Sequence, residues 1–189
     1  DNRIVQFRID LLGFKPPLWR RVQVPEASSL SDLHDVIQAL FGWEDQHLHK
    51  FEVGGQQYQS PEWIDDPFDT AVQSEDEITL ARLLNRKVQR FTYVYDFGDS
   101  WTHDLKVEKR REPDPNTAYP TLTGGKRMAP LEDCGGPGGF EELLHQALDP
   151  DDPNHEEALD WLGGGPVDPA AMDREAIERR LRGLQARLP

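Results

Sequence analysis

The alternation of apolar and polar residues near the start of the chain predicts a β-hairpin. Residues 5–11 alternate with the two-residue period of a half-buried strand, and residues 18–24 repeat that pattern. The stretch from Gly13 to Pro17 supplies the turn between the two runs, and Pro25 ends the second one. We therefore expect two antiparallel strands that bury one face.

The segment that follows predicts one amphipathic helix. Between Leu33 and Phe41, apolar side chains recur at i, i+3, i+4, i+7 and i+8, so they form one stripe along a helix. Ser29 or Ser31 can cap its first turn, and Asp32 stands three residues after Ser29, as a capping box requires. Gly42 is the expected stop.

Shorter patterns after this helix add further elements. A strand is expected from about residue 48 to residue 58, with Gly54 and Gly55 as a turn or bulge. Residues 60–76 are polar and indicate a surface segment. Ile78 to Leu84 fit a short strand or a single helical turn, and a second hairpin spans residues 91–107.

Three helices are expected in the last part of the chain. The first covers residues 140–148. The second covers residues 154–162, with Asn154 as its cap and Glu157 completing a capping box. Asp173 can cap the third, in which apolar residues repeat at close to 3.6.

Together these elements predict an α+β fold, with a β-grasp-like mixed sheet over one main helix, extended by a hairpin and by C-terminal helices. We expect residues 1–189 to form a single domain. Residues 1–112 would form the sheet-plus-helix core, residues 113–139 a loop region rich in proline and glycine, and residues 140–189 a helical extension packed on the core.

Composition narrows the class of protein. The 189 residues include five Trp and eight Phe, which is too aromatic for a disordered chain, and no apolar run is long enough to cross a membrane. One cysteine, Cys134, excludes an internal disulfide. With no apolar leader at its start, the chain is expected to be cytoplasmic.

The formal net charge of −14 argues against binding to nucleic acid, because an acidic chain repels the phosphate backbone. The acid is concentrated: residues 141–178 contain twelve Asp and Glu and one basic residue, Arg174. Solvated helix faces explain this concentration most simply. The alternative is a docking surface for a basic partner.

Histidines on two expected strands are the candidates for chemistry. Alternation places His47 and His49 on the face that carries Phe51, and it places His103 on the face that carries Trp101. If these strands are neighbours, the imidazoles and nearby carboxylates suit a divalent transition metal such as zinc or iron. The available carboxylates are Asp96, Asp99 and Glu132.

A structural interpretation competes with this one. A histidine on an apolar face is more often a hydrogen-bonded core residue than a ligand, and an aspartate after Gly98 is common in a hairpin turn. The second dense stretch, Lys126 to Phe140, contains glycines that indicate close backbone approach or a sharp entry into the helix at Phe140. It lacks the Gly-Lys-Ser/Thr ending of a phosphate loop, and Cys134 beside two acids makes a poor nucleophile.

Five motifs combine aromatic, histidine and carboxylate residues in one order along nearly the whole chain. The motifs are Phe14–Arg21, Leu33-His34 with Gly42-Trp43, His47–Phe51, Tyr95–His103 and Glu132–Pro137.

On these motifs, and on Trp161, the chain resembles the plasmid pRiA4b ORF-three-like proteins, also labelled insertion-element passenger proteins of TnpR type. The resemblance implies a bacterial or archaeal domain that is often found on mobile elements and has no established activity. Relatives often carry extra cysteines, where this chain has residues 121–122 and 129–131, so a cysteine-based zinc site cannot operate here. The resolvase activity implied by the passenger label is not supported, because a serine recombinase needs a basic DNA-reading module.

The leading functional hypothesis is a non-enzymatic module that binds a protein partner or a ligand. It rests on a set of aromatic motifs without a complete catalytic constellation. The residues expected to form its recognition surface are Trp19, Arg20, Arg21, Trp43, Asp96 and Trp101.

The alternative hypothesis is a metal-dependent hydrolase. Glu132 would be the general base, and Asp99 would be a third ligand or would orient the others. The expected metal ligands are His47, His49, His103 and Asp99. A small-molecule pocket without chemistry, between the sheet and the helices, is a third option. The oligomeric state does not follow from the sequence.

Overall fold

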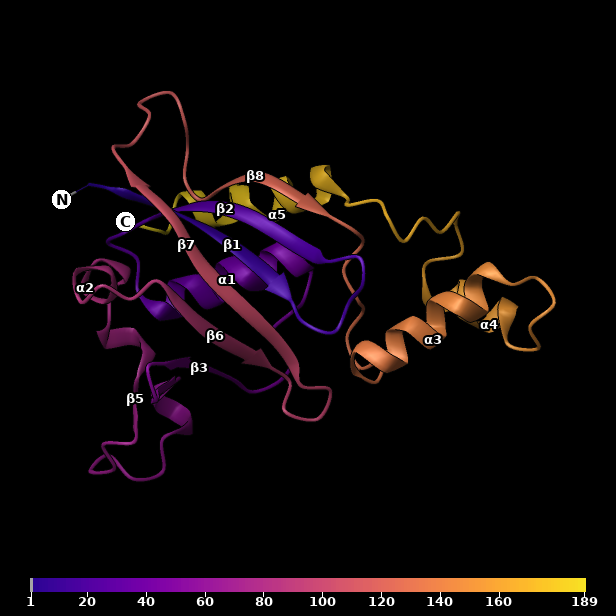
Figure 1. The fold of residues 1–189 in the computed structure, drawn as a ribbon, viewed down its shortest axis with the longest axis horizontal. Helices are drawn as coiled ribbons and strands as arrows, with labels where there is room; N and C mark the ends of the chain where they lie inside the picture. Colours follow the sequence, from indigo (N-terminus) through magenta and orange to yellow (C-terminus); the bar gives the residue numbers. More distant parts are fainter. Residues whose placement is uncertain (1) are drawn as a thin grey trace.

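The computed structural model describes residues 2–189 and contains one eight-stranded sheet in the order β5-β4-β3-β6-β7-β1-β2-β8 (Figure 1). Among the strand pairs of these residues, β4 and β5 are parallel and the others are antiparallel. The strands are β1 (Ile4–Leu11), β2 (Leu18–Pro25), β3 (His49–Val53), β4 (Gln56–Gln59), β5 (Val72–Ser74), β6 (Arg90–Tyr95), β7 (Trp101–Arg111) and β8 (Thr121–Lys126).

Five α-helices accompany the sheet, which confirms the α+β class; the likeness to a β-grasp stays a prediction. The helices are α1 (Leu30–Phe41), α2 (Leu80–Asn85), α3 (Gly136–Leu148), α4 (His155–Trp161) and α5 (Arg174–Gln185). Two short 3₁₀ turns, Pro61–Trp63 and Glu75–Glu77, lie in the surface segment.

Both predicted hairpins are confirmed. β1 pairs with β2 from Ile4 opposite Pro25 to Leu11 opposite Leu18, and β6 pairs with β7 across the turn at residues 96–100. Gly54 and Gly55 form a turn between two strands, β3 and β4, rather than a bulge within one strand. The residues from Leu80 adopt the helical alternative, α2.

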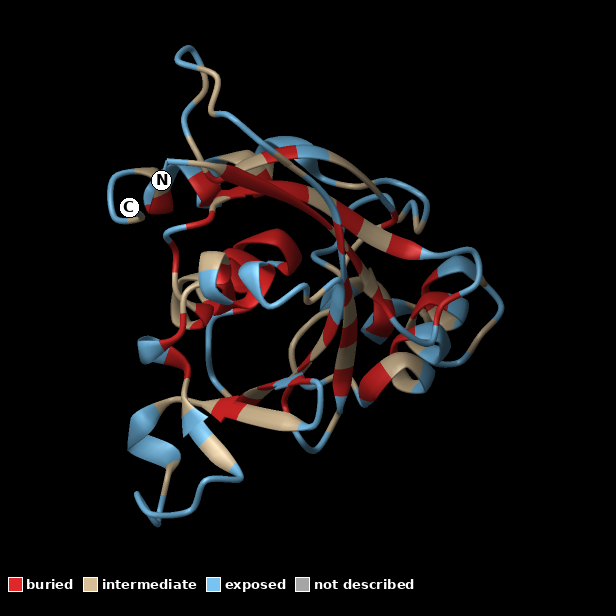
Figure 2. Cartoon of the chain, turned by 60° about the vertical axis from the view of Figure 1, so that its left-hand side comes forward, coloured by how far each residue is buried: buried red, intermediate tan, exposed pale blue. Residues whose placement is uncertain are grey.

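Helix α1 begins and ends where its sequence signals predict. The side chain of Ser29 accepts a hydrogen bond from the Asp32 amide, and the Asp32 carboxylate accepts one from the Ser29 amide, which completes a capping box. Gly42 ends the helix in the left-handed conformation, with φ of 75°. The sheet curves around this helix, and Figure 2 shows buried residues on both of the surfaces that meet.

The core lies between α1 and the concave face of the sheet. Leu33 and Ile37 of α1 and Phe7 and Ile9 of β1 are fully buried. Each such side chain contributes about 1.5–3 kcal/mol relative to an exposed one. Since these residues come from the two strongest periodic patterns in the sequence, the core is the part of the fold that the sequence specifies best.

One strand and one cap differ from the sequence predictions. Residues 121–126, expected within a loop region, form β8, which pairs with β2 at the edge of the sheet. This strand contains two glycines and no apolar alternation, so its own sequence pattern does not predict it. The strand forms because it pairs with β2. At the start of α4, the Asn154 side chain makes no capping hydrogen bond, so the capping box predicted with Glu157 is wrong.

The C-terminal helices occupy two places. Helix α5 packs against α1, and its residues Ile177, Leu181 and Leu184 are buried in the main core. Helices α3 and α4 pack on each other and project from one end of the sheet (Figure 1). Phe140 joins α3 to the core through an edge-to-face contact with Phe14, with ring centroids 6.1 Å apart.

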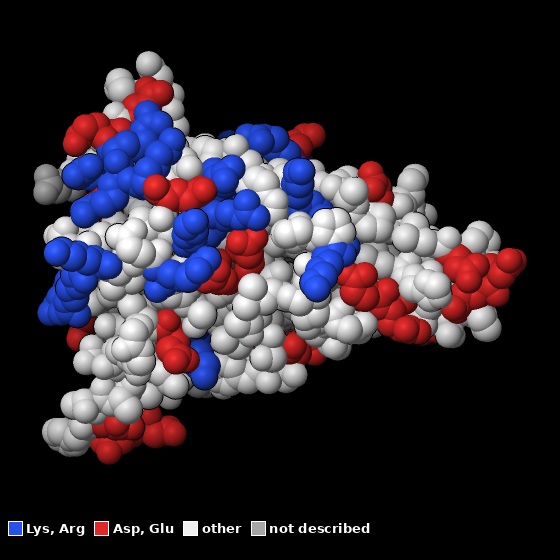
Figure 3. Space-filling view, viewed as in Figure 1, with Lys and Arg blue, Asp and Glu red and all other residues white. Residues whose placement is uncertain are grey.

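Charges of opposite sign separate on the surface. Figure 3 shows lysine and arginine over the outer face of the sheet and acidic residues on the lobe of α3 and α4. On the sheet face, several of these charges form ion pairs, among them Arg21 with Glu108 at 2.6 Å and Arg90 with Asp104 at 3.1 Å. The outer face of the sheet therefore carries both basic and acidic residues, although the net charge of the chain is −14. Among the described residues, no helix has the length and apolar character needed to traverse a lipid bilayer.

Replacing Gly42 with alanine should destabilise the protein by about 1 kcal/mol, because an L side chain is disfavoured at positive φ. The added Cβ would also lie 3.3 Å from a terminal nitrogen of Arg180. Urea denaturation measures the change. Gly183→Ala is the control: Gly183 lies within α5 with no atom near its Cβ position, so alanine should stabilise by about 0.5–1 kcal/mol. Equal effects from both substitutions would contradict this account.

Candidate metal centre

Four side chains from three separate segments meet at one end of the sheet. His47 lies in the loop between α1 and β3, Asp96 follows β6, and Glu132 and Asp133 precede α3. The Nε2 atom of His47 lies 2.7 Å from Asp133 Oδ1, and 3.6 Å from both Asp96 Oδ2 and Glu132 Oε2. We call these four residues the His47 cluster.

The Nε2 atom of His47 is buried but has no hydrogen-bond partner in the part of the chain that the structure describes. Asp133 Oδ1 lies 2.7 Å from this nitrogen, which is close enough for a hydrogen bond. The angle of the contact, and not its length, therefore prevents a hydrogen bond. Three carboxylates therefore surround a ring nitrogen without accepting a well-directed hydrogen bond from it. A buried polar atom without a partner is unusual in a folded protein and requires an explanation.

Local backbone geometry holds two of these carboxylates in place. Asp96 and Asp133 both have positive φ, 60° and 58°, a conformation uncommon for residues other than glycine. The amides of Gly98 and Asp99 donate to Asp96 Oδ1, which leaves Oδ2 facing His47. Strained conformations of this kind gather at functional sites.

Asp99 and the glycines of the 132–139 stretch bring the two loops together. Asp99 Oδ2 accepts a hydrogen bond of 3.1 Å from the Gly135 amide, so its carboxylate joins the loops and does not face His47. A Cβ on Gly136 would lie 2.7 Å from the Asp99 carbonyl oxygen, and one on Gly139 would overlap the Cys134 carbonyl. The close backbone approach predicted from these glycines is confirmed.

Glu132 is held separately from the other carboxylates. The Tyr95 hydroxyl donates to Glu132 Oε1 at 2.9 Å, and the Glu44 amide donates to the same oxygen at 3.0 Å. Burial of Tyr95, together with its bond to Glu132, raises the pKa of the tyrosine well above its usual value. The hydroxyl therefore stays protonated and keeps donating to the carboxylate.

The cluster has the chemistry of a divalent metal site. Ligand atoms of His47, Asp96 and Asp133 all lie within 4.8 Å of one another. One imidazole and two carboxylates from different segments suit zinc, manganese or iron, which accept mixed nitrogen and oxygen ligands. Glu132 Oε2 lies at 3.6 Å from the same imidazole nitrogen, at the edge of this ligand set.

A second group of polar residues is buried between α1 and β3. The rings of His34 and His49 stack with centroids 3.5 Å apart and an angle of 9° between their planes. His34 pairs with Asp45 at 2.9 Å and with the Tyr93 hydroxyl at 2.7 Å, while His49 pairs with Glu75 at 2.8 Å. The bond from His34 lowers the pKa of Asp45.

This second group is better explained as a hydrogen-bonded network than as a metal site. A metal ion binds an imidazole nitrogen along the plane of the ring, and two parallel stacked rings cannot both direct a nitrogen at one ion. The carboxylate partners of His34 and His49 already occupy one nitrogen of each ring. The network lines a cavity of about 510 Å³ between α1 and the segment that carries Glu75.

Comparison with known proteins assigns the chain to a family. The sequence profile described as "Plasmid pRiA4b ORF-3-like protein" matches residues 3–176. The chain belongs to the plasmid pRiA4b ORF-3-like family. Uncharacterized protein y4hQ of Sinorhizobium fredii is 34% identical over 186 residues, which cover 97% of this chain and 93% of that protein. The crystal structure of a protein of unknown function, MM3350 from Methanosarcina mazei Go1, matches with a TM-score of 0.82 and 32% identity over 92% of this chain and 97% of that one.

In this member of the plasmid pRiA4b ORF-3-like family, the predicted histidine pair does not form one site. His49 on β3 and His103 on β7 share the concave face of the sheet, but β6 lies between their strands. Tyr93 stands between the two rings, 5.8 Å from His49 and 5.1 Å from His103. The condition that these strands are neighbours is not met, because β6 lies between them and pairs with both.

His103 is a core residue. Its Nδ1 atom bonds the Tyr93 carbonyl oxygen at 3.1 Å, and its ring packs against Phe41 and Trp43. Complete burial lowers its pKa from 6.5 to about 3, so the ring is neutral near pH 7. Its other nitrogen, Nε2, is buried and has no hydrogen-bond partner among residues 2–189.

The expected recognition residues divide between the core and the surface. Trp43 and Trp101 are buried and stack on each other, so they cannot form a contact surface for a protein. Arg20 is also buried. Trp19 lies on the outer face of the sheet, and Arg21 stacks on it with the guanidinium carbon 4.9 Å from the ring centroid.

The sequence pattern missed Asp133 as a cluster member, although it named the motif that contains it. The signal available in the sequence was two carboxylates in succession, Glu132 and Asp133, shortly before Gly135 and Gly136. Burial and the nearby Asp99 raise the pKa of the Cys134 thiol to about 11, in line with the expectation that it is a poor nucleophile.

The low pKa of His103 predicts a pH-dependent stability. The pKa of His103 is about 3 in the folded protein and 6.5 in the unfolded chain, so the unfolded chain takes up a proton more readily as the pH falls. The contribution of the neutral His103 ring to folding stability is therefore complete above pH 6.5 and is lost as the pH falls toward 3. The loss reaches about 1.4 kcal/mol per pH unit at most. In His103→Gln, which retains a donor for the Tyr93 carbonyl, the free energy of unfolding should fall less steeply below pH 6.5.

Urea denaturation at several pH values, with a chelator present, measures this slope. His145→Gln changes an exposed histidine of α3 and should keep the wild-type slope. A His103→Gln variant with the same slope as the wild type would show that His103 does not cause the acid sensitivity.

Proposed function

We propose that this protein is a ligand-binding module built around a divalent transition-metal centre, with His47, Asp96 and Asp133 as ligands. The observation that supports it best is the buried Nε2 atom of His47, which has no hydrogen-bond partner although three carboxylates surround it. A cation among these atoms would satisfy the nitrogen and the carboxylates together. It would also explain why two aspartates adopt positive φ here.

Electrostatics support a cation at this place. Three carboxylates that face one point repel one another, and a protonated His47 offsets only one of the three charges. A divalent ion would offset two. The competing explanation is a histidine that is simply protonated and ion-paired, and this arrangement would hold no metal.

The ligand types favour zinc or manganese over a metal that needs sulfur. The single cysteine, Cys134, is half-buried, and its pKa is raised to about 11, so it offers no thiolate at neutral pH. The proposed ligands are one nitrogen and carboxylate oxygens, which are the donors that these ions accept.

The metal proposal is tested by titrating the metal-free protein with Zn²⁺ and with Mn²⁺ in a calorimeter. We expect one ion per chain, and we expect His47→Ala and Asp133→Asn each to weaken binding by at least about tenfold, since each removes a ligand. Asparagine tolerates positive φ, so Asp133→Asn should keep the loop conformation.

Matched control variants are His155→Ala and Asp160→Asn, which change the same residue types in α4. Both should bind metal as the wild type does. Binding of less than about a tenth of an equivalent by the wild type at neutral pH would exclude the metal centre. Equal losses in the ligand variants and in the controls would show that the substitutions act through folding.

Metal-dependent hydrolysis is a second candidate function, and the position of Glu132 favours it. Its carboxylate is held by Tyr95 and by the Glu44 amide at the edge of the proposed ligand set, where a general base for a metal-bound water belongs. His49, His103 and Asp99, expected earlier as ligands, contribute to other parts of the structure.

Glu132→Gln separates this candidate from simple metal binding. If Glu132 is a base, the metal-loaded variant should keep its ion but lose, by at least about a hundredfold, any hydrolysis of activated carboxylate or phosphate esters that the wild type shows. Protein without Zn²⁺ or Mn²⁺ is the blank. Wild-type rates no higher than the blank, on every ester class tried, would remove the hydrolase candidate and leave the binding module.

A protein partner, an association with mobile elements and a cytoplasmic location are further parts of the proposal. Trp19 supports the first of these, because it lies on the outer face of the sheet with the guanidinium carbons of Arg8 and Arg21 at 4.5 and 4.9 Å from its ring centroid. Aromatic and arginine side chains of this kind are frequent in protein interfaces.

A further inference from the structure

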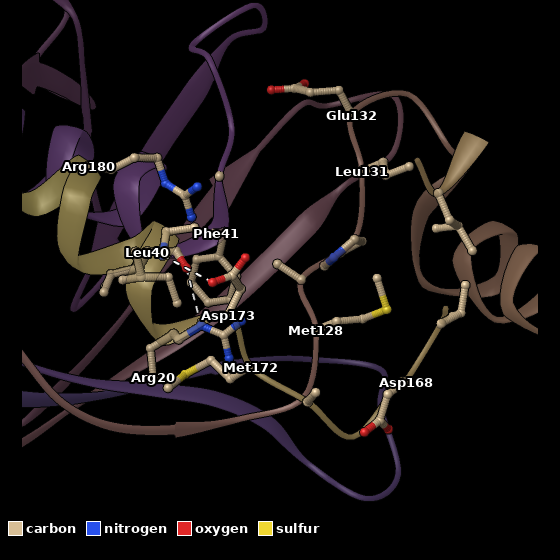
Figure 4. A pocket seen from close by; sticks show the side chains of 18 of the residues that line it. Arg20, Leu40, Phe41, Met128, Leu131, Glu132, Asp168, Met172, Asp173 and Arg180 are labelled. Atoms are coloured by element: carbon tan, nitrogen blue, oxygen red, sulfur yellow. Dashed lines mark hydrogen bonds between the residues drawn. The ribbon is translucent and has the colours of Figure 1, made fainter. Parts of the chain in front are cut away.

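A cavity separate from the second buried network lies where the end of α1 meets α5. Its volume is about 860 Å³, which is within the range of small-molecule sites. Figure 4 shows Arg20 and Arg180 at one end of it, beside Leu40 and Phe41. The apolar residues of its other walls include Met128, Leu131, Leu162, Val167, Met172 and Ile177.

Arg20 is an almost completely buried cation, with 1% of its surface exposed. Its Nε donates to the Leu40 carbonyl oxygen at 3.2 Å, and its Nη1 donates to the carbonyls of Trp19 and Lys126 at 2.9 and 3.0 Å. The remaining nitrogen, Nη2, donates to no acceptor among the described residues. The head group thus has a free donor in the wall of the cavity.

Arg180 reaches the same place from α5. Its Nε donates to the Ala39 carbonyl oxygen at 2.7 Å, and its two terminal nitrogens donate to no acceptor in residues 2–189. No carboxylate oxygen of these residues lies within 4.0 Å of either guanidinium group. Burial and the repulsion from Arg180 lower the pKa of Arg20 to about 10.

Capping of α1 explains part of this arrangement. Both arginines bond carbonyls of its last turn, where the helix dipole places about half a negative charge. Arg20 is the buried member of this pair, whereas Arg180 is exposed and solvent screens its charge. The buried charge of Arg20 without a carboxylate partner is costly, and an anion from outside the chain would relieve it.

The acidic residues of the cavity do not supply that anion. Asp173 caps α5 by accepting from the Ala176 amide at 3.1 Å, and Asp168 accepts from the Ala170 amide at 3.0 Å. Glu132 is held by Tyr95. Glu44, the fourth acid, is exposed. Burial lowers the pKa of Arg180, and the attraction of Asp173, which does not contact it, offsets only part of this effect.

We propose that this cavity binds a small organic acid with an apolar tail. Its carboxylate would accept from the free nitrogens of Arg20 and Arg180, because a planar carboxylate matches the paired donors of a guanidinium group. Its tail would lie against Met128, Met172 and Leu162, and methionine side chains adapt to tails of different shape. This binding requires no metal at the His47 cluster, so the two proposals stand or fall separately.

Octanoate is the probe that tests the proposal. Calorimetric titration of the full chain, with a chelator present to keep metal out, should show saturable binding of one octanoate. The fluorescence of Trp161, which lines the cavity, gives a second readout. Arg180→Gln should weaken octanoate by at least about tenfold, while 1-octanol should bind the wild type at least about tenfold more weakly than octanoate does.

Arg179→Gln is the matched control, because it removes the same charge from the neighbouring position of α5, which is also exposed but does not line the cavity. It should bind octanoate as the wild type does. Arg20 is less suitable as a first variant, since its burial makes Arg20→Gln prone to misfolding.

Three results would overturn the proposal. The first is no binding of octanoate by the wild type at about 10 mM, the upper end of weak affinity. The others are octanoate binding by Arg180→Gln as tight as by Arg179→Gln, and 1-octanol binding by the wild type as tight as that of octanoate. Octyl phosphate that binds at least about tenfold more tightly than octanoate would overturn the choice of a carboxylate. Thermal unfolding of both variants shows whether a loss of binding in Arg180→Gln reflects a lost cap on α1.

Discussion

The structure depends on how helix α1 ends inside the curved sheet. Gly42 turns the chain out of the helix at positive φ, and Trp43 then packs against Phe41 and Trp101 in the core. This fixes the start of the loop that presents His47 to the carboxylates beyond β6. The same helix end supplies the carbonyls that hold the two arginines of the larger cavity.

A network of polar groups is also buried beside α1, between this helix and β3. His34, His49 and Tyr93 are buried next to apolar residues, and each finds a hydrogen-bond partner. Buried polar groups that are fully paired specify one arrangement of the chain, since any other arrangement leaves a group without a partner. The His47 cluster differs, because its central nitrogen lacks such a partner.

The two proposed sites share one residue, Glu132. Its Oε2 atom lies 3.6 Å from His47 Nε2, and the residue also lines the arginine cavity. The cluster is rich in carboxylates and suits a cation, whereas the end of the cavity carries two guanidinium groups and suits an anion.

The sequence by itself determined the elements whose hydrophobic period and caps agree. Helix α1 is capped by Ser29, one of the two predicted candidates, and by Gly42, the predicted stop, and both hairpins form where alternation and turn residues coincide. Membership of the plasmid pRiA4b ORF-3-like family was also predicted from the sequence, by five short motifs that follow one another in a fixed order along the chain. Each of these features depends on residues close together in the chain, so local patterns are enough to specify it.

Only the tertiary structure decided which distant residues meet. Strand alternation correctly placed His49 and His103 on one face, but no local pattern shows that β6 inserts between their strands. β8 forms because it can pair with the free edge of β2. Asp133 lies beside His47 because the glycines near Asp99 allow the loop after β6 and the loop before α3 to approach each other. Strand order and loop approach depend on packing across the whole domain, and the period of any one segment carries no information about them.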